Sequence, residues 1–357
     1  MRYILLGLVL GFIVNFFIVL HKGGVAIVPA FNVKIENINT GLTRNTNVDQ
    51  SIETFGVKSG KDIFCINANG ELVGHSGFPH LASVSSNGKF FVQFEKVGRE
   101  IEYFNISGER FWRMRSLEYP YVSAAGRLIL LKIGDHSSIR ISDFNGNVFS
   151  ENDIQGKFST VISFSERNDF GAVGFFCGNY YFVSDTGGVI HSGRSPQGMM
   201  VKSIAISSNG KYGAVHSGDV ANDIVTLVNF ERGTSRGIRL QNVHKTRIPL
   251  HVNDNGEITL VESDYIVRYR QNTKPLFQIR INERRDGQHS ITTGNGFTSI
   301  TFMSKNGGVE NIVFTDSGNV LVYKTYPTET FLVSYPSQSS ILLRGSENLF
   351  GYRLDGL

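Results

Sequence analysis

Short segments of alternating apolar and polar residues follow one another along most of the chain, separated by small polar turns. From His80 onward, four such segments read HLASVSS, KFFVQFEK, EIEYFNI and RFWRMRS. Alternation over four to eight residues predicts β-strands. No helical segment of any length is predicted after residue 22, which excludes the parallel α/β folds.

The turns between these segments recur at a fixed interval. The pentapeptide SSNGK begins at residue 85 and again at residue 207, which is three intervals of about 41 residues. Asn-Gly supplies the positive φ angles that a tight hairpin needs. A second family of turns has glycine near its centre, at Gly70, Gly108, Gly146, Gly187, Gly233, Gly318 and Gly356. One turn of that series, near Asn272, Thr273 and Lys274, lacks glycine.

Four antiparallel strands in about 40 residues is the size of one blade of a β-propeller. A two-layer sandwich does not require so regular an interval. We therefore predict an all-β fold, a single propeller of four-stranded blades over residues 41–357. Six complete units are expected, at 79–115, 118–154, 157–197, 199–240, 247–280 and 288–327.

The number of blades depends on the two ends of the repeat region. The C-terminal end has three strands, TFLVSYP, SILLRGS and LFGYRL, and the region before residue 79 has IETFGV, DIFCIN and ELVGH. If these fragments share one blade there are seven blades, and if each forms its own blade there are eight. Eight is favoured, because an outer strand near 33–37 would then pair with LFGYRL and close the ring. This arrangement requires an inner strand at GLTRNTN, which is unusually polar.

The SSNGK turn resembles the Ser-Pro-Asp-Gly-Lys turn of the WD40-like propeller repeats found in bacterial envelope proteins. The Gly-His and Trp-Asp signatures of true WD40 repeats are absent. So is the repeated tryptophan of quinone-dependent propellers, since Trp112 is the single tryptophan. The resemblance implies the fold and carries no active-site residue with it.

The N-terminal segment has a different character. Tyr3 to Leu20 is a run of 18 residues without charge, and as a helix it would span roughly 27 Å. Residues 1–22 are therefore predicted to form an uncleaved transmembrane signal anchor, with a cleaved signal peptide as the alternative. Residues 23–40 would be a short linker that includes the candidate ring-closing strand. The prediction is a single-pass membrane protein with its propeller on the non-cytoplasmic side, which in a bacterium is the periplasm.

The residue content offers little chemistry. The net charge of +4 argues against a nucleic-acid binder. None of the nine histidines has metal-ligand spacing, and no catalytic motif is present. Cys65 and Cys177 are predicted to be two buried small side chains, although their spacing leaves a disulfide open. No cofactor, metal or catalytic residue is predicted.

Positive charge is concentrated between residues 232 and 285, a segment that contains eleven basic and five acidic residues. This segment could contact an acidic partner or anionic headgroups. The candidate contact residues are Arg232, Arg236, Arg239, Lys245, Arg247, Arg284 and Arg285. The predicted function is a non-catalytic scaffold for envelope protein partners, held at the membrane through Tyr3 to Leu20.

The alternative function is an enzyme or a small-ligand binder with its site in the central channel. Such a site would need polar side chains converging from the inner strands. The candidates are Ser83, Ser85, Ser123, Ser163, Ser165, Ser207, His251 and Thr292.

Overall fold

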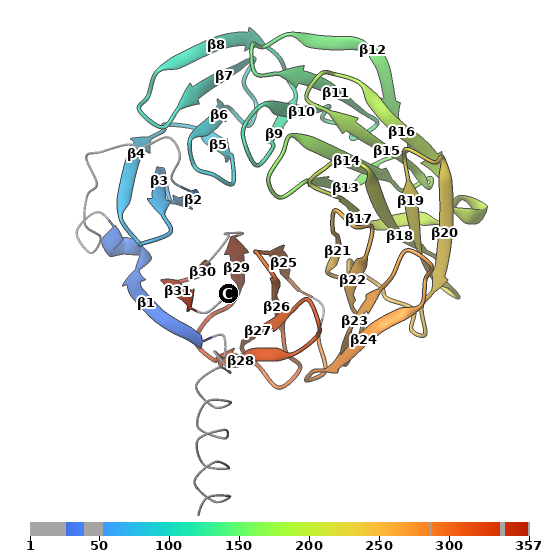
Figure 1. The fold of residues 1–357 in the computed structure, drawn as a ribbon. Coiled ribbons are helices and arrows are strands. Elements are labelled where there is room, and N and C mark those ends of the chain that lie inside the picture. The colour runs from blue at the N-terminus through green and yellow to red at the C-terminus, as the bar shows by residue number, and fades with distance from the viewer. Residues whose placement is uncertain (1–25, 39–52, 286, 336–339, 356–357) are drawn as a thin grey trace, which may run out of the picture.

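The fold is an all-β propeller of eight blades, as predicted (Figure 1). The computed structural model describes residues 26–38, 53–285, 287–335 and 340–355. Within these ranges the strands form eight antiparallel sheets around one axis. The first strand of each complete blade is nearest the axis, and the last strand forms the rim (Figure 1).

Six of the blades each contain four consecutive strands, numbered here as blades 2 to 7. Blades 2 and 3 are β5 (Leu81–Val84), β6 (Phe90–Phe94), β7 (Glu100–Asn105), β8 (Arg110–Arg115), and β9 (Tyr119–Val122), β10 (Leu128–Lys132), β11 (Ser138–Asp143), β12 (Val148–Gln155). Blades 4 and 5 are β13 (Ser159–Phe164), β14 (Phe170–Phe175), β15 (Asn179–Ser184), β16 (Val189–Arg194), and β17 (Met200–Ile206), β18 (Tyr212–Gly218), β19 (Asp223–Asn229), β20 (Thr234–Arg239). Blades 6 and 7 are β21 (Leu250–Val252), β22 (Ile258–Val261), β23 (Tyr265–Tyr269), β24 (Pro275–Arg280), and β25 (Ser290–Thr293), β26 (Phe297–Met303), β27 (Val309–Thr315), β28 (Val320–Tyr326). All six lie within the predicted units or within one residue of them.

Blade 8 closes the ring with strands from both ends of the chain. It consists of β29 (Leu332–Tyr335), β30 (Ser340–Gly345), β31 (Asn348–Asp355) and β1 (Ala26–Lys34). The register runs from Ala26 opposite Asp355 to Lys34 opposite Asn348. Ring closure through LFGYRL is thus confirmed. The closing strand lies earlier in the chain than predicted, at Ala26–Lys34 instead of near 33–37. Residues Ile35–Asn37 form a short 3-10 turn, η1, which buries Ile35.

Blade 1 has three described strands, β2 (Thr54–Ser59), β3 (Asp62–Asn67) and β4 (Leu72–Gly77). The inner strand predicted at GLTRNTN lies outside the described residues. The predicted anchor at 1–22 also lies outside them. Within the part of the chain that the structure describes, no helix is long and apolar enough to cross a bilayer.

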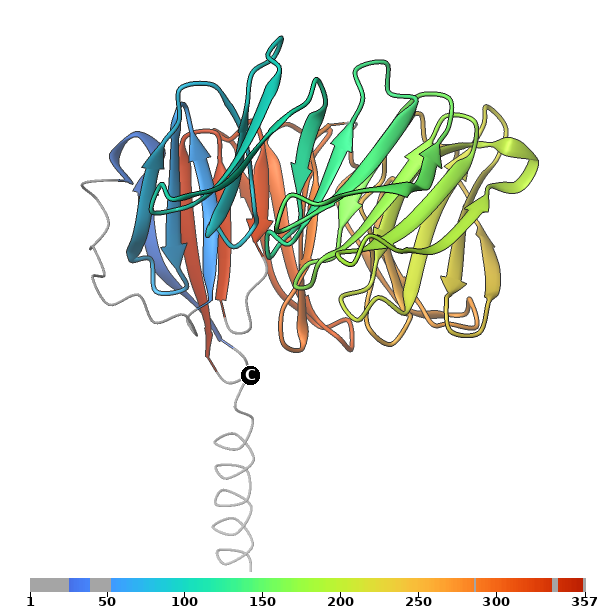
Figure 2. The same ribbon diagram turned by 90° about the horizontal axis from the view of Figure 1, so that it is seen from above.

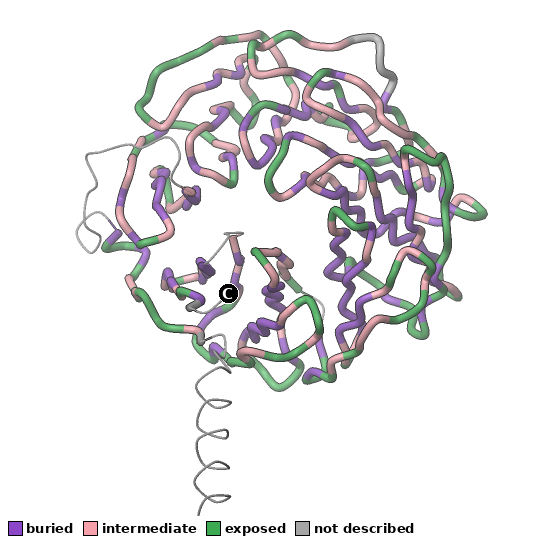
Figure 3. The backbone as a smooth tube through the Cα atoms, in the orientation of Figure 1, coloured by how far each residue is buried: buried purple, intermediate pink, exposed green. Residues whose placement is uncertain are grey.

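Buried residues follow the inner and middle strands, whereas exposed residues are most frequent along the rim strands (Figure 3). Aromatic side chains fill the spaces between blades. Tyr103 of blade 2 stacks on Trp112 and meets Phe144 of blade 3 edge-on. The contact with Phe144 joins two blades, and each buried ring contributes about 1.5–3 kcal/mol.

A repeated serine explains the regular inner turns. Its hydroxyl accepts a hydrogen bond from the backbone N–H five residues later, at the start of the second strand. The pairs are Ser85 with Phe90, Ser123 with Leu128, Ser165 with Phe170 and Ser207 with Tyr212, at 3.0–3.2 Å. These four serines were candidates for a channel site; the structure shows that they hold turns instead.

The disc has two faces with different connections (Figure 2). The turn face carries the first and third hairpin of each blade, which include the Asn-Gly turns. The connection face carries the second hairpin of each blade and the links between blades. Because β31 ends at the turn face and Ala26 lies opposite Asp355, the described chain enters the propeller at the turn face.

Candidate functional site

Exposed apolar side chains are concentrated on the connection face. Twelve large apolar residues are exposed among the described ones, and seven of them lie in the connections of this face. We call these seven the apolar arc: Val97, Leu117, Ile133, Phe158, Phe176, Val220 and Val243. Within the described turns of the turn face, no large apolar residue is exposed. This asymmetry between the two faces makes the connection face the better candidate for a binding surface.

The apolar arc covers only part of the ring. It runs from the second hairpin of blade 2 to the link between blades 5 and 6. Val97 and Val220 are 92% and 98% exposed, so nothing within the described chain covers them. In blades 7 and 8, the described connections carry charged residues such as Lys305 and Glu347 in place of apolar ones.

The centre of the arc contains two residues in a strained conformation. His136 and Phe158 have φ angles of 63° and 54°, in the left-handed region that bulky side chains avoid. Their rings stack at a centroid distance of 4.7 Å, although Phe158 remains 56% exposed. Left-handed residues of this kind cost of order 1–3 kcal/mol and tend to occur at binding sites.

A cavity of about 540 Å³ lies beside this stack, between blades 3 and 4. Its lining includes Lys157, Cys177 and Arg194. Cys177 and Cys65 are both free cysteines. Cys177 is partly exposed, whereas Cys65 is buried. Burial would raise the pKa of Cys177, but hydrogen bonds from the N–H groups of Asn179 and Lys157 hold it below its usual value.

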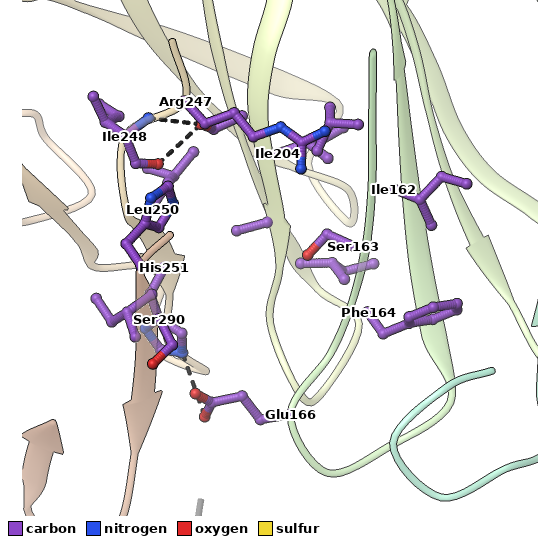
Figure 4. A pocket seen from close by; sticks show the side chains of 16 residues that line it. Ile162, Ser163, Phe164, Glu166, Ile204, Arg247, Ile248, Leu250, His251 and Ser290 are labelled. Atoms are coloured by element: carbon purple, nitrogen blue, oxygen red, sulfur yellow. Dashed lines mark hydrogen bonds and ion pairs between the residues drawn. The ribbon is translucent and has the colours of Figure 1, made fainter. Parts of the chain in front are cut away.

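A second cavity, of about 250 Å³, lies in the central channel between β13, β17, β21 and β25 (Figure 4). Aliphatic residues make up half of its lining, and Ser163 and His251 from the predicted channel set also line it. Arg247 extends across its upper end and Glu166 across its lower end, as Figure 4 is drawn. The other channel candidates not already placed in turns, Ser83 and Thr292, do not line this cavity.

Arg247 and Glu166 make contacts that skip blades. The Arg247 guanidinium, before blade 6, donates to the Thr160 carbonyl of blade 4 at 2.6 Å. Glu166, after the inner strand of blade 4, accepts from the Thr293 N–H of blade 7 at 2.9 Å. It also lies 3.6 Å from Nε2 of His251 in blade 6. The cavity is therefore bounded at both ends by charged side chains that reach across the channel.

A buried chain of ionisable groups supports the link between blades 5 and 6. Lys202 Nζ lies 2.6 Å from Asp223, whose other oxygen is 2.9 Å from His216 Nε2. Lys202 also donates to the His244 carbonyl at 2.6 Å, and His244 Nε2 lies 3.0 Å from Glu262. Buried charges need such partners, because an unpaired one is strongly unfavourable.

This chain of contacts extends to Arg284, whose Nη2 lies 3.4 Å from Nδ1 of His244. Burial lowers the pKa of His216, which favours its neutral form. Although burial alone would raise the pKa of Asp223, hydrogen bonds from His216 and Lys202 hold it below its usual range. The hydrogen bonds of Lys202 and Asp223 to the backbone of His244 therefore fix the link that carries Val243 and Arg247.

The predicted basic residues do not form one patch. Arg236 and Arg239 lie exposed along the rim strand β20, and Arg232 lies at its turn-face end. Lys245, Arg247 and Arg285 are exposed on the connection face. Arg284 differs from the prediction of a contact residue, because only 7% of it is exposed.

The excess charge of this segment is also partly internal. Arg268 is buried and pairs with Asp316 of the next blade at 2.8 Å. It donates as well to the hydroxyls of Thr259 and Thr298, at 2.9 and 2.6 Å. Arg268 therefore joins two blades and is not part of an exposed basic patch.

Sequence reasoning missed the residues that define the cavity ends and the buried network. Glu166 lies in a polar turn like many others, and no local feature marks it. Lys202 has a signal, since a charge interrupts the apolar strand MVKSIAI. Within the described residues, no three His, Cys, Asp or Glu side chains are grouped as a metal site requires.

Comparisons with known proteins show the fold. No protein-family model matches the chain, and no curated protein matches its sequence. Among solved structures, BamB from Moraxella catarrhalis matches with 9% identity and a TM-score of 0.59, covering 92% of this chain and all of BamB. The Dos1 propeller matches with 9% identity and a TM-score of 0.57, covering 92% of this chain and 95% of that one. The C-terminal WD40 domain of Sif2 matches with 10% identity and a TM-score of 0.61, covering 92% and 98%.

Proposed function

We propose that the chain is a membrane-tethered propeller that serves as a non-catalytic scaffold for protein partners in the cell envelope. The observation that carries this proposal is the apolar arc, which is confined to the connection face. Phe158 and Phe176, beside the cavity at blades 3 and 4, would supply the aromatic anchors that dominate many protein interfaces. The propeller fold of the solved neighbours is compatible with this role and does not by itself establish it.

The geometry of the tether supports a partner other than the tethering membrane. The described chain enters at the turn face, opposite the apolar arc. Only residues 21–25 separate Ala26 from the apolar run that ends at Leu20, which limits the span to about 20 Å. The turn face would then lie next to the membrane, and the connection face would be presented to other proteins. Lys245, Arg247 and Arg285 would add positive charge beside the arc.

Site-specific photo-crosslinking in the native membrane tests this proposal. A photoreactive phenylalanine analogue replaces Phe158 or Phe176 in the full-length protein. The matched control is Asn145, which is exposed on the turn face of blade 3. We expect Phe158 and Phe176 to capture the same protein in stoichiometric yield, and Asn145 not to capture it. Equal capture from both faces, or capture from neither, would contradict the proposal.

The membrane tether and its orientation are tested separately. Removal of residues 3–20 should release the protein from alkali-washed membranes, whereas the full-length chain should stay with them. A cysteine introduced at the exposed Val220, in a variant lacking Cys177, should react with a membrane-impermeant maleimide in intact cells. Labelling only after lysis would place the propeller in the cytoplasm and overturn the orientation.

A further inference from the structure

The central cavity has a partly aliphatic wall, which also carries hydroxyl groups, and a charged side chain at each end. Val161, Ile204, Leu250 and Ile291 are among the aliphatic residues that line it. Its volume of about 250 Å³ is below the usual range for drug-sized ligands and corresponds to roughly eight water molecules. A small apolar group therefore fits it better than a nucleotide or a sugar chain.

The upper end of the cavity favours an anion. Among the described residues, the guanidinium of Arg247 makes one hydrogen bond of 2.6 Å, to the Thr160 carbonyl, and an arginine has five N–H donors. His289 lines the same end. Burial, and to a lesser extent the positive charges of Arg284 and Arg247, lower the pKa of His289 to about 4. An arginine in this setting binds carboxylates through paired N–H donors.

The lower end is closed to a second anion. The Glu166 carboxylate is held by the Thr293 N–H at 2.9 Å and by the Thr293 hydroxyl. Its negative charge would repel a carboxylate at this end, so an anionic ligand has one orientation. The Nδ1 atom of His251, buried in the wall, has no hydrogen-bond partner among the described residues. Such an atom is expected to find a partner in a ligand or in water.

We propose that this cavity binds a carboxylate attached to a small apolar body, with Arg247 holding the carboxylate. The apolar body lies between the aliphatic walls and points toward Glu166. Because Arg247 is exposed at the connection face, the ligand enters from that side. A free short-chain acid has this chemistry, and so has the C-terminal carboxylate of a peptide that ends in an apolar residue.

Calorimetric titration of the full-length protein in detergent micelles tests the site, with empty micelles as the blank. Butanoate is compared with butanamide and butylamine. Gly-Gly-Val is compared with the same peptide amidated at its C-terminus. We expect at least one carboxylate to bind in a 1:1 ratio and each amide or amine to bind at least tenfold more weakly. Butanoate binding identifies a free acid as sufficient, whereas binding of the peptide acid alone identifies a protein C-terminus.

Two variants locate the site. R247Q should weaken carboxylate binding at least tenfold, while R236Q, a matched change at an exposed rim arginine, should leave it unchanged. S163F, which fills the cavity from the partly exposed Ser163, should abolish binding and provides an independent test if R247Q is unstable. The proposal is overturned if no carboxylate binds up to about 10 mM, if amides bind equally well, or if R236Q has the effect expected of R247Q. Carboxylate binding does not depend on the apolar arc. The binding experiment can therefore contradict this proposal while the crosslinking experiment still supports the scaffold function.

Discussion

The ammonium group of Lys202 lies 2.6 Å from the carboxylate of Asp223, and the side chains are only 4% and 0% exposed. Asp223 also accepts from His216 and from the backbone N–H of His244. One buried carboxylate thus joins two strands of blade 5 to the link that leads into blade 6. Because that link carries Val243 and Arg247, this pair positions one end of the apolar arc and one end of the channel cavity.

Replacing Lys202 with Met should be strongly destabilising. The change leaves Asp223 buried without its main cation, and breaking a buried ion pair costs about 3–5 kcal/mol. Urea unfolding, followed by tyrosine and tryptophan fluorescence, measures the loss. The control is K211M, which removes the exposed pair of Lys211 with Glu231 and should cost less than about 1 kcal/mol. Equal losses in the two variants would show that the buried pair has no special role.

Stability should fall as the pH falls below about 6.5. Burial lowers the pKa of His216 and His289 in the folded protein, so the unfolded chain binds more protons in this range. Each histidine contributes stability that is present above its unfolded pKa and is lost below it, by at most about 1.4 kcal/mol per pH unit. Around His216 the charged or titratable groups are Asp223, Lys202 and His244.

Urea midpoints at about pH 7.5, 6 and 5 test this pH dependence, in a range where Asp223 stays ionised. H216Q and H289Q should each flatten the slope. H80Q is the control, because His80 is exposed and its ion-pair partner among the described residues, Glu95, is exposed as well, and it should keep the full slope. A midpoint that is constant or rises between pH 7.5 and 5 would contradict the prediction.

The blades could be read from the sequence because their turns depend on local backbone requirements. Gly88 and Gly210, in the two SSNGK copies, have φ angles of 71° and 67°. The turn near 272–274 was expected although it lacks glycine, and there Thr273 takes a φ of 65°. Such signals lie within five residues, so one sequence is enough to reveal them.

The candidate sites could not be read in the same way. The contact of Glu166 with Thr293 joins residues 127 positions apart, and it depends on how the inner strands are placed around the axis. The basic residues were grouped by their position along the chain, but the structure distributes them between the interior and both faces of the disc. Arg268 is buried between blades and Arg232 lies on the turn face, whereas Lys245 lies on the connection face. The composition of each surface therefore could not be predicted without the structure.

Gly88 and Gly108 offer a matched test of packing at a turn. Both have positive φ, 71° and 85°, so alanine is strained at either position. A Cβ at Gly88 would lie 2.7 Å from the Cα of Gly56 in blade 1, whereas a Cβ at Gly108 would meet nothing within 4 Å. We expect G88A to cost about 2–5 kcal/mol and G108A about 1 kcal/mol in urea unfolding. If the two costs are similar, the close approach of blades 1 and 2 does not limit this turn.

Ring closure by β1 predicts unequal effects for two N-terminal truncations. Removing residues 1–38 deletes β1 and the buried Ile35 and Ile38, and it leaves β31 as an open sheet edge. The lost burial alone should cost about 3 kcal/mol or more, and the open edge should promote self-association. Removing residues 1–23 leaves all of β1 in place and should change neither property. Urea unfolding and light scattering measure both. A chain starting at residue 39 that is as stable and monomeric as one starting at residue 24 would show that pairing of β1 with β31 does not hold the ring together.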